Sequence, residues 1–133
     1  MSGIYGIHHL CVNTRNMDES LAFYQDLMGF SLLGRERCAF GEYAMLRLGE
    51  SRLELIQPKD PDENSFGNRG SLTHFGLAVR NIDETVAGLR AKGVKFLSEE
   101  IVDCDEPMGG LRAISLLGPS QEAINLYEFK RDF

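Results

Sequence analysis

The sequence predicts an α+β fold built from two copies of one βαβββ module. The second half of the chain repeats the first, and both halves show the same order of strand-like and helix-like segments. With 133 residues, of which 43% are hydrophobic, the chain can form one domain with one substantial core. We therefore expect a single domain over residues 1–133, with module one at about 4–57, a linker at about 58–71 and module two at about 72–130.

The repeat becomes visible at an offset of 65 residues, which is the separation between His9 and His74. At this offset the run Arg-Asn-Met-Asp-Glu-Ser at 15–20 aligns without a gap with Arg-Asn-Ile-Asp-Glu-Thr at 80–85. The two mismatches keep their chemistry, because one apolar side chain replaces another and one hydroxyl replaces another. Chance does not supply this many matches, so we interpret the chain as a duplication.

Module one begins with an apolar, strand-like run at 7–14, which leads to a helix predicted over 18–28. Asn16, or the aspartate two residues later, is the predicted N-cap, and the acidic first turn suits the helix dipole. Gly29 is predicted to end the helix, since glycine commonly follows a helix C-terminus. Three further strands are predicted over 30–40, 43–48 and 52–57.

Module two repeats this order. A strand over 72–79 leads to a helix over 83–92, with Asn81 or the following aspartate as N-cap and Gly93 as the terminating residue. Further strands are predicted over 95–103, 111–117 and 123–129. The linker at 58–71, rich in proline, glycine and charge, is long enough for the modules to meet within one chain or between two chains.

The composition restricts the partners of the protein. The net charge of −6 argues against nucleic acid or an anionic membrane, because both select basic surfaces. The N-terminus lacks the pattern of a signal peptide, and no apolar run approaches the roughly 18 residues of a membrane span. Cys11, Cys38 and Cys104 are odd in number and lack CxxC spacing, as expected for reduced thiols. We therefore expect a soluble, cytoplasmic protein.

Strand alternation sends a small set of polar side chains to one face of each module. In module one, His9 and Cys11 alternate with packing residues in the first strand, and Glu54 lies between two leucines in the last strand. In module two the same parity places His74 and Asn125 on the equivalent face. An approximate two-fold relation between the modules then allows His9, Glu54, His74 and Asn125 to converge on one point.

His9, Glu54 and His74 are candidate ligands of one divalent metal ion. Imidazole nitrogen together with carboxylate oxygen suits Zn²⁺, Ni²⁺, Co²⁺, Fe²⁺ or Mn²⁺ better than Ca²⁺ or Cu⁺. Three such ligands leave positions open for water and a substrate oxygen, and Asn125 either adds a weak neutral ligand or does not bind. The carboxylate of Glu54 needs a partner on a half-buried strand. A metal ion would satisfy it, and so would one of three arginines: Arg47, Arg52 or Arg112.

The pattern resembles the vicinal oxygen chelate superfamily, which includes glyoxalase I, methylmalonyl-CoA epimerase, extradiol dioxygenases and fosfomycin- and bleomycin-resistance proteins. The resemblance covers nearly the whole chain. Its most specific part is Phe-Tyr-Gln-Asp-Leu-Met-Gly-Phe at 23–30, supported by the sequences around His9, Glu54 and His74. It implies a curved, barrel-like mixed sheet around a central cavity, and a homodimer.

The resemblance also implies that the metal ligands come from the first and last strands of each module. By position these are His9, Glu54, His74 and the residue at Asn125, where metal-dependent isomerases of the family typically have a glutamate that is both ligand and acid/base group. This chain departs from the family pattern at Asn125. Glu128 lies nearby in sequence, but on the opposite face of the strand unless a bulge shifts the register.

By this resemblance, the first candidate function is a metal-dependent isomerase or lyase of the glyoxalase or epimerase type. Glu54 would move a proton beside the carbonyl of a small carbonyl or oxyacid substrate, while the metal stabilises an enediolate. The alternative is a metal-free protein that binds or sequesters a small molecule, which Asn125 favours and the other three residues oppose. A non-haem iron dioxygenase is the third option. Both packing and site roles remain open for Cys11 and Tyr127.

Overall fold

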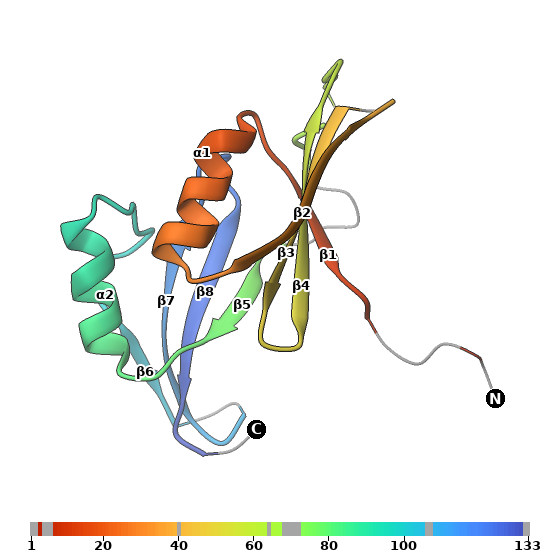
Figure 1. Ribbon diagram of the computed structural model, residues 1–133. Coiled ribbons are helices and arrows are strands. Elements are labelled where there is room, and N and C mark those ends of the chain that lie inside the picture. Colours follow the sequence, from red (N-terminus) through yellow and green to blue (C-terminus); the bar gives the residue numbers. More distant parts are fainter. Residues whose placement is uncertain are drawn as a thin grey trace. The chain divides into compact units, whose positions relative to one another are not determined.

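The computed structural model describes residues 3, 7–39, 41–63, 65–67, 73–105 and 108–131. The chain divides into two compact units, Met1–Asn68 and Arg69–Phe133. Each unit contains one strand, a helical segment and three further strands, in that order (Figure 1). The predicted α+β fold class with two βαβββ modules is therefore confirmed. Among the described residues, no helix is long and apolar enough to cross a membrane.

Unit one forms an open four-stranded sheet with the strand order β1-β4-β3-β2. β1 pairs with β4 in parallel, and the other neighbours are antiparallel, so the first and last strands of the module lie side by side. Its elements are β1 (Leu10–Asn13), α1 (Met17–Leu21), the π-helical η1 (Ala22–Leu27), β2 (Ser31–Cys38), β3 (Gly41–Leu48) and β4 (Ser51–Pro58).

Unit two has the same topology, with the strand order β5-β8-β7-β6 and a parallel pair formed by β5 and β8. The other neighbours are again antiparallel. Its elements are β5 (Phe75–Ala78), α2 (Ile82–Ala91), β6 (Val102–Cys104), β7 (Leu111–Leu117) and β8 (Ala123–Phe129). The two copies therefore agree in connectivity and in strand order.

The helical segment of unit one starts and ends as its sequence predicts. Asn16 has extended backbone and accepts a hydrogen bond from the Glu19 amide, so it is the N-cap. The amide of Met17, the first helical residue, donates to Gln57 Oε1 in β4 over 2.7 Å. Gly29 follows the helix with a φ of 82°, a left-handed conformation that glycine adopts without strain.

The helix of unit two is capped differently from the prediction for Asn81. Asn81 adopts a left-handed backbone with a φ of 53°, and among the described residues its side chain makes no capping hydrogen bond. A side-chain N-cap requires extended backbone at this position, which explains the difference. Instead, Glu128 Oε1 in β8 accepts a hydrogen bond of 2.8 Å from the amide of Ile82. The cap thus comes from a residue 46 positions away in sequence.

Alternation along β4 and β8 separates a buried face from a half-buried polar face, as predicted. Leu53 and Leu55 are buried in β4, whereas Glu54 between them is half-buried. In β8, Ile124 and Leu126 are buried on either side of a half-buried Asn125, and burial of each such aliphatic side chain contributes about 1.5–3 kcal/mol. Helical residues complete each core, namely Met17, Leu21, Phe23, Tyr24, Ile82, Val86 and Leu89.

The prediction of one continuous strand over 95–103 is wrong. Phe96 forms an isolated bridge with Leu116, and regular pairing with β7 resumes only in β6. Between these two points the backbone carbonyls of Ser98 and Glu99 accept hydrogen bonds from the Arg90 guanidinium of α2. These contacts hold the segment at the helix, and the strand is interrupted there.

Candidate functional site

The first half-site lies where β1 and β4 run side by side in unit one. β1 begins at Leu10, so His9 immediately precedes the strand and does not lie within it as predicted. Cys11 is the register partner of Glu54 in the parallel pair. His9 Nε2 lies 3.4 Å from Glu54 Oε1, and the two side chains are 36% and 19% exposed. The structure thus brings together the two residues singled out in module one.

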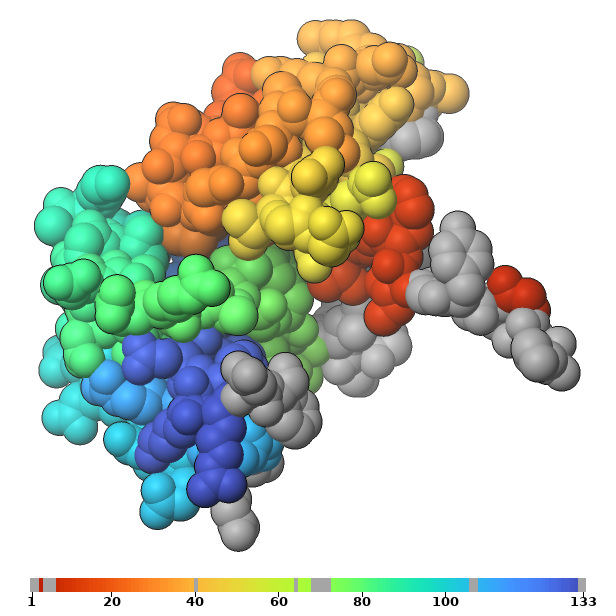
Figure 2. All heavy atoms as spheres, turned by 60° about the horizontal axis from the view of Figure 1, so that its bottom comes forward, coloured from red at the N-terminus to blue at the C-terminus, as the bar shows by residue number. Residues whose placement is uncertain are grey.

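Both ring nitrogens of His9 have neighbours. His8 Nδ1 lies 3.0 Å from His9 Nδ1, and the two rings meet edge to face. One of these nitrogens carries a proton in the contact, because two lone pairs repel each other. The other ring nitrogen, His9 Nε2, faces Glu54. The segment that leads into β1, drawn in red, lies at the surface in Figure 2, in agreement with the exposure of both histidines.

The thiol of Cys11 has a raised pKa beside Glu54. Desolvation by the surrounding protein raises its pKa from 9.0 to about 12, and the negative charge of Glu54 and a hydrogen bond to that carboxylate contribute further. The residue as a whole retains exposed surface, so its thiol is only partly buried. The thiol is therefore protonated at neutral pH and acts as a hydrogen-bond donor to Glu54 instead of a thiolate.

The second half-site lies at the equivalent place in unit two. β5 begins at Phe75, so His74 also precedes its strand, and the predicted strand start at residue 72 lies outside the described residues. Asn125 is the register partner of Gly76. Asn125 Nδ2 donates to the Tyr127 hydroxyl over 2.8 Å, and this hydroxyl lies 3.3 Å from His74 Nε2. His74 and Asn125 are thus linked through Tyr127.

The second half-site is a chain of hydrogen-bonding hydroxyl, amide and imidazole groups. Asn125 Oδ1 accepts a hydrogen bond of 2.6 Å from Ser115, and Thr73 Oγ1 lies 2.8 Å from His74 Nδ1. One of the two lone pairs of the oxygen that Asn125 would offer to a metal ion is therefore occupied. By contrast, the imidazole nitrogen and carboxylate oxygen of the first half-site are donors that suit a divalent transition metal.

Glu128 lies on the opposite face of β8 from Asn125, as its parity predicts. The β7–β8 register is unbroken, with Arg112 opposite Glu128 and Ser115 opposite Asn125. Because the Glu128 carboxylate accepts a hydrogen bond from the helix amide of Ile82, it faces α2. Glu128 therefore does not supply a second carboxylate to the half-site.

The four residues singled out from the sequence form two pairs, one in each unit. His9 and Glu54 are in direct contact, whereas His74 and Asn125 both contact the hydroxyl of Tyr127 and not each other. Within the described part of the chain, no group of three or more His, Cys, Asp or Glu side chains is arranged to hold a metal ion. Their convergence on one ion stays a prediction.

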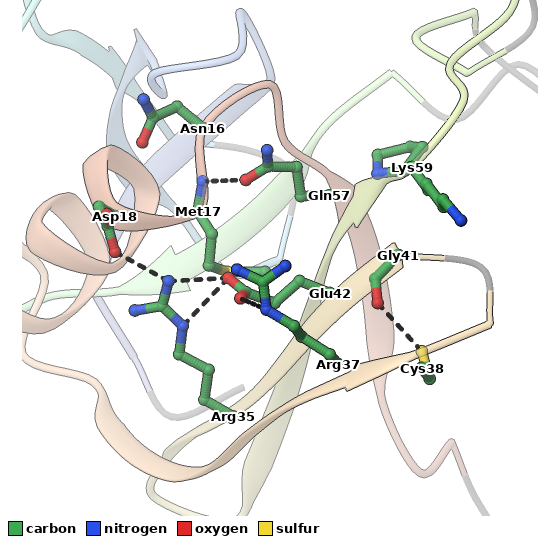
Figure 3. A pocket seen from close by; sticks show the side chains of 11 residues that line it. Asn16, Met17, Asp18, Arg35, Arg37, Cys38, Gly41, Glu42, Gln57 and Lys59 are labelled. Carbon is green, nitrogen blue, oxygen red and sulfur yellow. Dashed lines mark hydrogen bonds and ion pairs between the residues drawn. The ribbon is translucent and has the colours of Figure 1, made fainter.

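A separate pocket of about 520 Å³ lies in unit one, at the start of α1 and the adjoining ends of β2, β3 and β4 (Figure 3). Arg35 lines this pocket and makes ion pairs of 2.8 Å to Asp18 and 2.7 Å to Glu42. Arg37 lies 3.8 Å from Glu42. These ion pairs tie the first turn of the helix to the sheet. The strand parity of Arg35, Arg37 and Glu42 is visible in the sequence, but the pairing of Arg35 with Asp18 requires the packed helix.

A family model described as the Glyoxalase/Bleomycin resistance protein/Dioxygenase superfamily matches residues 6–121. The chain belongs to this superfamily. The resemblance inferred from the residues around His9, Glu54 and His74 is thereby confirmed. Members of the glyoxalase superfamily bind small molecules, typically use divalent metals and are commonly dimeric.

Curated relatives and a solved structure agree with this membership. A probable lactoylglutathione lyase of Synechocystis is 29% identical over 97 residues, covering 68% of this chain and 72% of the relative. The human mitochondrial methylmalonyl-CoA epimerase is 25% identical over 104 residues, covering 71% of this chain and 58% of the epimerase. The crystal structure of a glyoxalase family protein from Enterococcus faecalis has a TM-score of 0.75 at 25% identity, covering 92% and 97% of the two chains.

Proposed function

We propose that this member of the glyoxalase superfamily is a metal-dependent isomerase or lyase of the glyoxalase/epimerase type, which acts on a small carbonyl or oxyacid compound. The contact of 3.4 Å between His9 Nε2 and Glu54 Oε1 carries this proposal. It joins an imidazole and a half-buried carboxylate at the place where the two parallel strands of the module meet. The similarity to a lactoylglutathione lyase and an epimerase supports it at the level of the family.

His9, Glu54 and His74 would hold the ion, which is Zn²⁺, Ni²⁺, Co²⁺, Mn²⁺ or Fe²⁺ by the chemistry of these donors. Such an ion acts as a Lewis acid on a carbonyl oxygen. Asn125 fits this role poorly, because Ser115 already donates to its oxygen. Binding through three protein ligands would leave room for a substrate oxygen.

Glu54 is the proposed catalytic base. Its carboxylate would take the proton from the carbon beside the substrate carbonyl, so that the C–H bond breaks and an O–H bond forms on the carboxyl group. In a glyoxalase-like isomerisation the same carboxyl group would then return the proton to the neighbouring carbon, whereas an epimerisation would need a second acid on the opposite face of the enediolate. Cys11 donates a hydrogen bond to Glu54 and so orients the carboxylate. Partial burial of Glu54 limits its access to water.

Elemental analysis tests the metal-dependent function. Untagged protein is purified without chelators, and His9→Ala, Glu54→Gln and His74→Ala are prepared in parallel. We expect about one ion per chain in the wild type, and at least about a hundredfold weaker binding in each variant, because even partners of the ligands change affinity by about 10–100-fold.

Glu42→Gln is the matched control for this experiment, because Glu42 is a carboxylate of the same sheet that belongs to the arginine pocket. It should retain the ion. Wild-type protein that takes up none of the five metals after reconstitution would overturn the metal-dependent function.

The second candidate is a metal-free protein that binds or sequesters a small molecule. It is favoured by the closed hydrogen-bond chain of Ser115, Asn125, Tyr127 and His74, which satisfies the second half-site without an ion. Thermal-shift screening of carbonyl compounds and aromatic natural products, in the presence and absence of EDTA, separates the two. Stabilisation by a ligand that survives EDTA supports binding without metal, and stabilisation that EDTA abolishes contradicts it.

A further inference from the structure

The second half-site contains a hydroxyl that has no counterpart in the first. Tyr127 is the register partner of Ala78, and the equivalent pair in unit one joins Asn13 to Ile56. The aromatic ring of Tyr127 is held in place on two sides. It stacks on Phe129 with ring centroids 5.8 Å apart, and a Cβ at Gly76 would lie only 2.6 Å from its Cε2 atom.

The hydrogen bonds around Tyr127 are consistent with a chain in which its hydroxyl donates to His74. Ser115 donates to Asn125 Oδ1, because a carbonyl oxygen only accepts. Asn125 Nδ2 then donates to the Tyr127 hydroxyl oxygen. In this chain the Tyr127 hydroxyl proton points to the remaining contact, which is the lone pair of His74 Nε2 at 3.3 Å.

The other side of the imidazole completes this assignment. A neutral histidine that accepts at Nε2 carries its proton at Nδ1. His74 Nδ1 lies 2.8 Å from Thr73 Oγ1, a hydroxyl oxygen that can accept this proton. The chain therefore runs from Ser115 through Asn125, Tyr127 and His74 to Thr73 without a conflict between two donors or two acceptors.

We propose that Tyr127 is a positioning residue, which holds neutral His74 in the Nδ1–H tautomer with the Nε2 lone pair directed at its hydroxyl. In this arrangement Asn125 acts as the link that fixes the proton of Tyr127, and not as a metal ligand. The assignment rests on the proposed function in one point only, namely that a metal ion would bind His74 Nε2 in place of the hydrogen bond from Tyr127. A hydroxyl proton thus occupies this lone pair in the metal-free protein.

Nitrogen NMR of the histidine side chains tests the assignment directly in EDTA-treated protein at a pH of about 8.5, where an imidazole of ordinary pKa is neutral. The ¹⁵N shifts and two-bond couplings distinguish the protonated ring nitrogen from the unprotonated one. His74→Gln assigns the His74 signals among those of the three histidines. We expect His74 to be in the Nδ1–H form in the wild type.

Two variants disturb the Tyr127 contact by different routes. Tyr127→Phe removes the hydroxyl, and Gly76→Ala keeps it but displaces the ring, since the added methyl group meets Cε2. Both should convert His74 to a mixture of tautomers. Tyr43→Phe removes a phenol hydroxyl that bonds Glu36 in unit one, and it should leave the His74 signals unchanged. An Nε2–H tautomer in the wild type, or an unchanged tautomer in both variants, overturns the proposal.

Zinc titration of the same proteins separates this inference from the proposed function. Thr73→Val removes the acceptor at Nδ1, and we expect it to weaken Zn²⁺ binding about tenfold, the usual effect of losing a partner that orients a ligand histidine. If the tautomers behave as expected and the wild type binds neither Zn²⁺ nor any of the other four metals, the assignment of Tyr127 is supported while the metal-dependent function fails. If the tautomer of His74 is unchanged in both Tyr127→Phe and Gly76→Ala, the assignment is contradicted whatever the zinc titration shows.

Discussion

The two modules share a backbone plan but differ in the charge of the polar face beside the parallel strand pair. In module one, Cys11 is the register partner of Glu54, and a histidine contacts the carboxylate. In module two, Gly76 is the register partner of Asn125, and the amide bonds to Tyr127. The same topology thus carries a half-site with an anionic donor in one copy and a neutral hydrogen-bond chain in the other.

The difference teaches that strand order and side-chain chemistry are separable in this fold. The buried faces of β4 and β8 carry aliphatic side chains in both modules, because each sheet packs on a helix. The polar faces carry no such packing requirement. A side chain there can change from carboxylate to amide as long as its hydrogen bonds are satisfied, and Ser115 and Tyr127 satisfy those of Asn125.

The most direct test of the difference between the half-sites is Asn125→Glu, which gives module two the carboxylate of module one. We expect Zn²⁺ affinity to rise at least about tenfold, because a negatively charged oxygen donor replaces an engaged amide. Competition with a chromophoric chelator measures the change. Asn125→Gln, which has the length of glutamate without its charge, is the matched control. Equal zinc affinity of the two variants would show that position 125 does not face the ion.

A second comparison concerns the helix caps. Gln57 in β4 and Glu128 in β8 both accept a hydrogen bond from the first amide of their helix, to Met17 and Ile82 respectively. The acceptor is a neutral amide in unit one and a carboxylate in unit two. Since charged acceptors form stronger hydrogen bonds and suit the positive end of a helix, the cap of unit two should contribute more.

Alanine substitution of both capping residues tests this ranking. We expect Glu128→Ala to lower the free energy of unfolding by about 1–2 kcal/mol and Gln57→Ala by about 0.5–1 kcal/mol. Urea denaturation followed by circular dichroism measures both. Glu128→Gln converts the second cap into the first and should fall between the wild type and Glu128→Ala. A Gln57→Ala effect as large as that of Glu128→Ala contradicts the role of the charge.

Much of this frame could be predicted because it depends on local sequence. The strand alternation around Glu54 and Asn125, the Asn16 cap and the Gly29 terminus all follow from residues close together in the chain, and the repeat follows from comparing two such stretches. The capping role of Glu128 and the pocket around Arg35 could not be predicted, because their partners come from distant elements. A single sequence gives the parity of a side chain but not the partner that it meets.

The half-sites show the same limit. Parity placed Tyr127 on the face of His74, but not the hydrogen bonds that join them through one hydroxyl. The prediction of a strand over 95–103 was wrong for a related reason. The hydrophobic pattern does not reveal that Arg90 donates a hydrogen bond to the backbone carbonyl of Ser98. Long-range hydrogen bonds decide these details.

The smallest difference between the modules lies in how an arginine holds the first helical turn. In unit two, Arg112 in β7 contacts both carboxylate oxygens of Asp83, over 2.6 and 3.0 Å. In unit one, Arg35 in β2 contacts Asp18 and also Glu42, so it keeps a partner if Asp18 is removed. The hydrogen bond from Arg112 lowers the pKa of Asp83 below its usual value of 3.8.

This lowered pKa predicts a weak dependence of stability on acidic pH. Because the unfolded state binds a proton at Asp83 more readily than the folded state, the ion pair stabilises the fold above pH 3.8 and loses this effect as the pH falls through the lower, folded-state pKa. Asp83→Asn should therefore flatten the acid limb of the stability curve slightly, and the effect should shrink in 1 M NaCl because the pair is exposed. Asp18→Asn should change the stability less, since Arg35 retains Glu42. Thermal unfolding between about pH 2.5 and 6 measures both variants. A larger effect of Asp18→Asn would mean that the helix of unit one depends more on its ion pair than the helix of unit two.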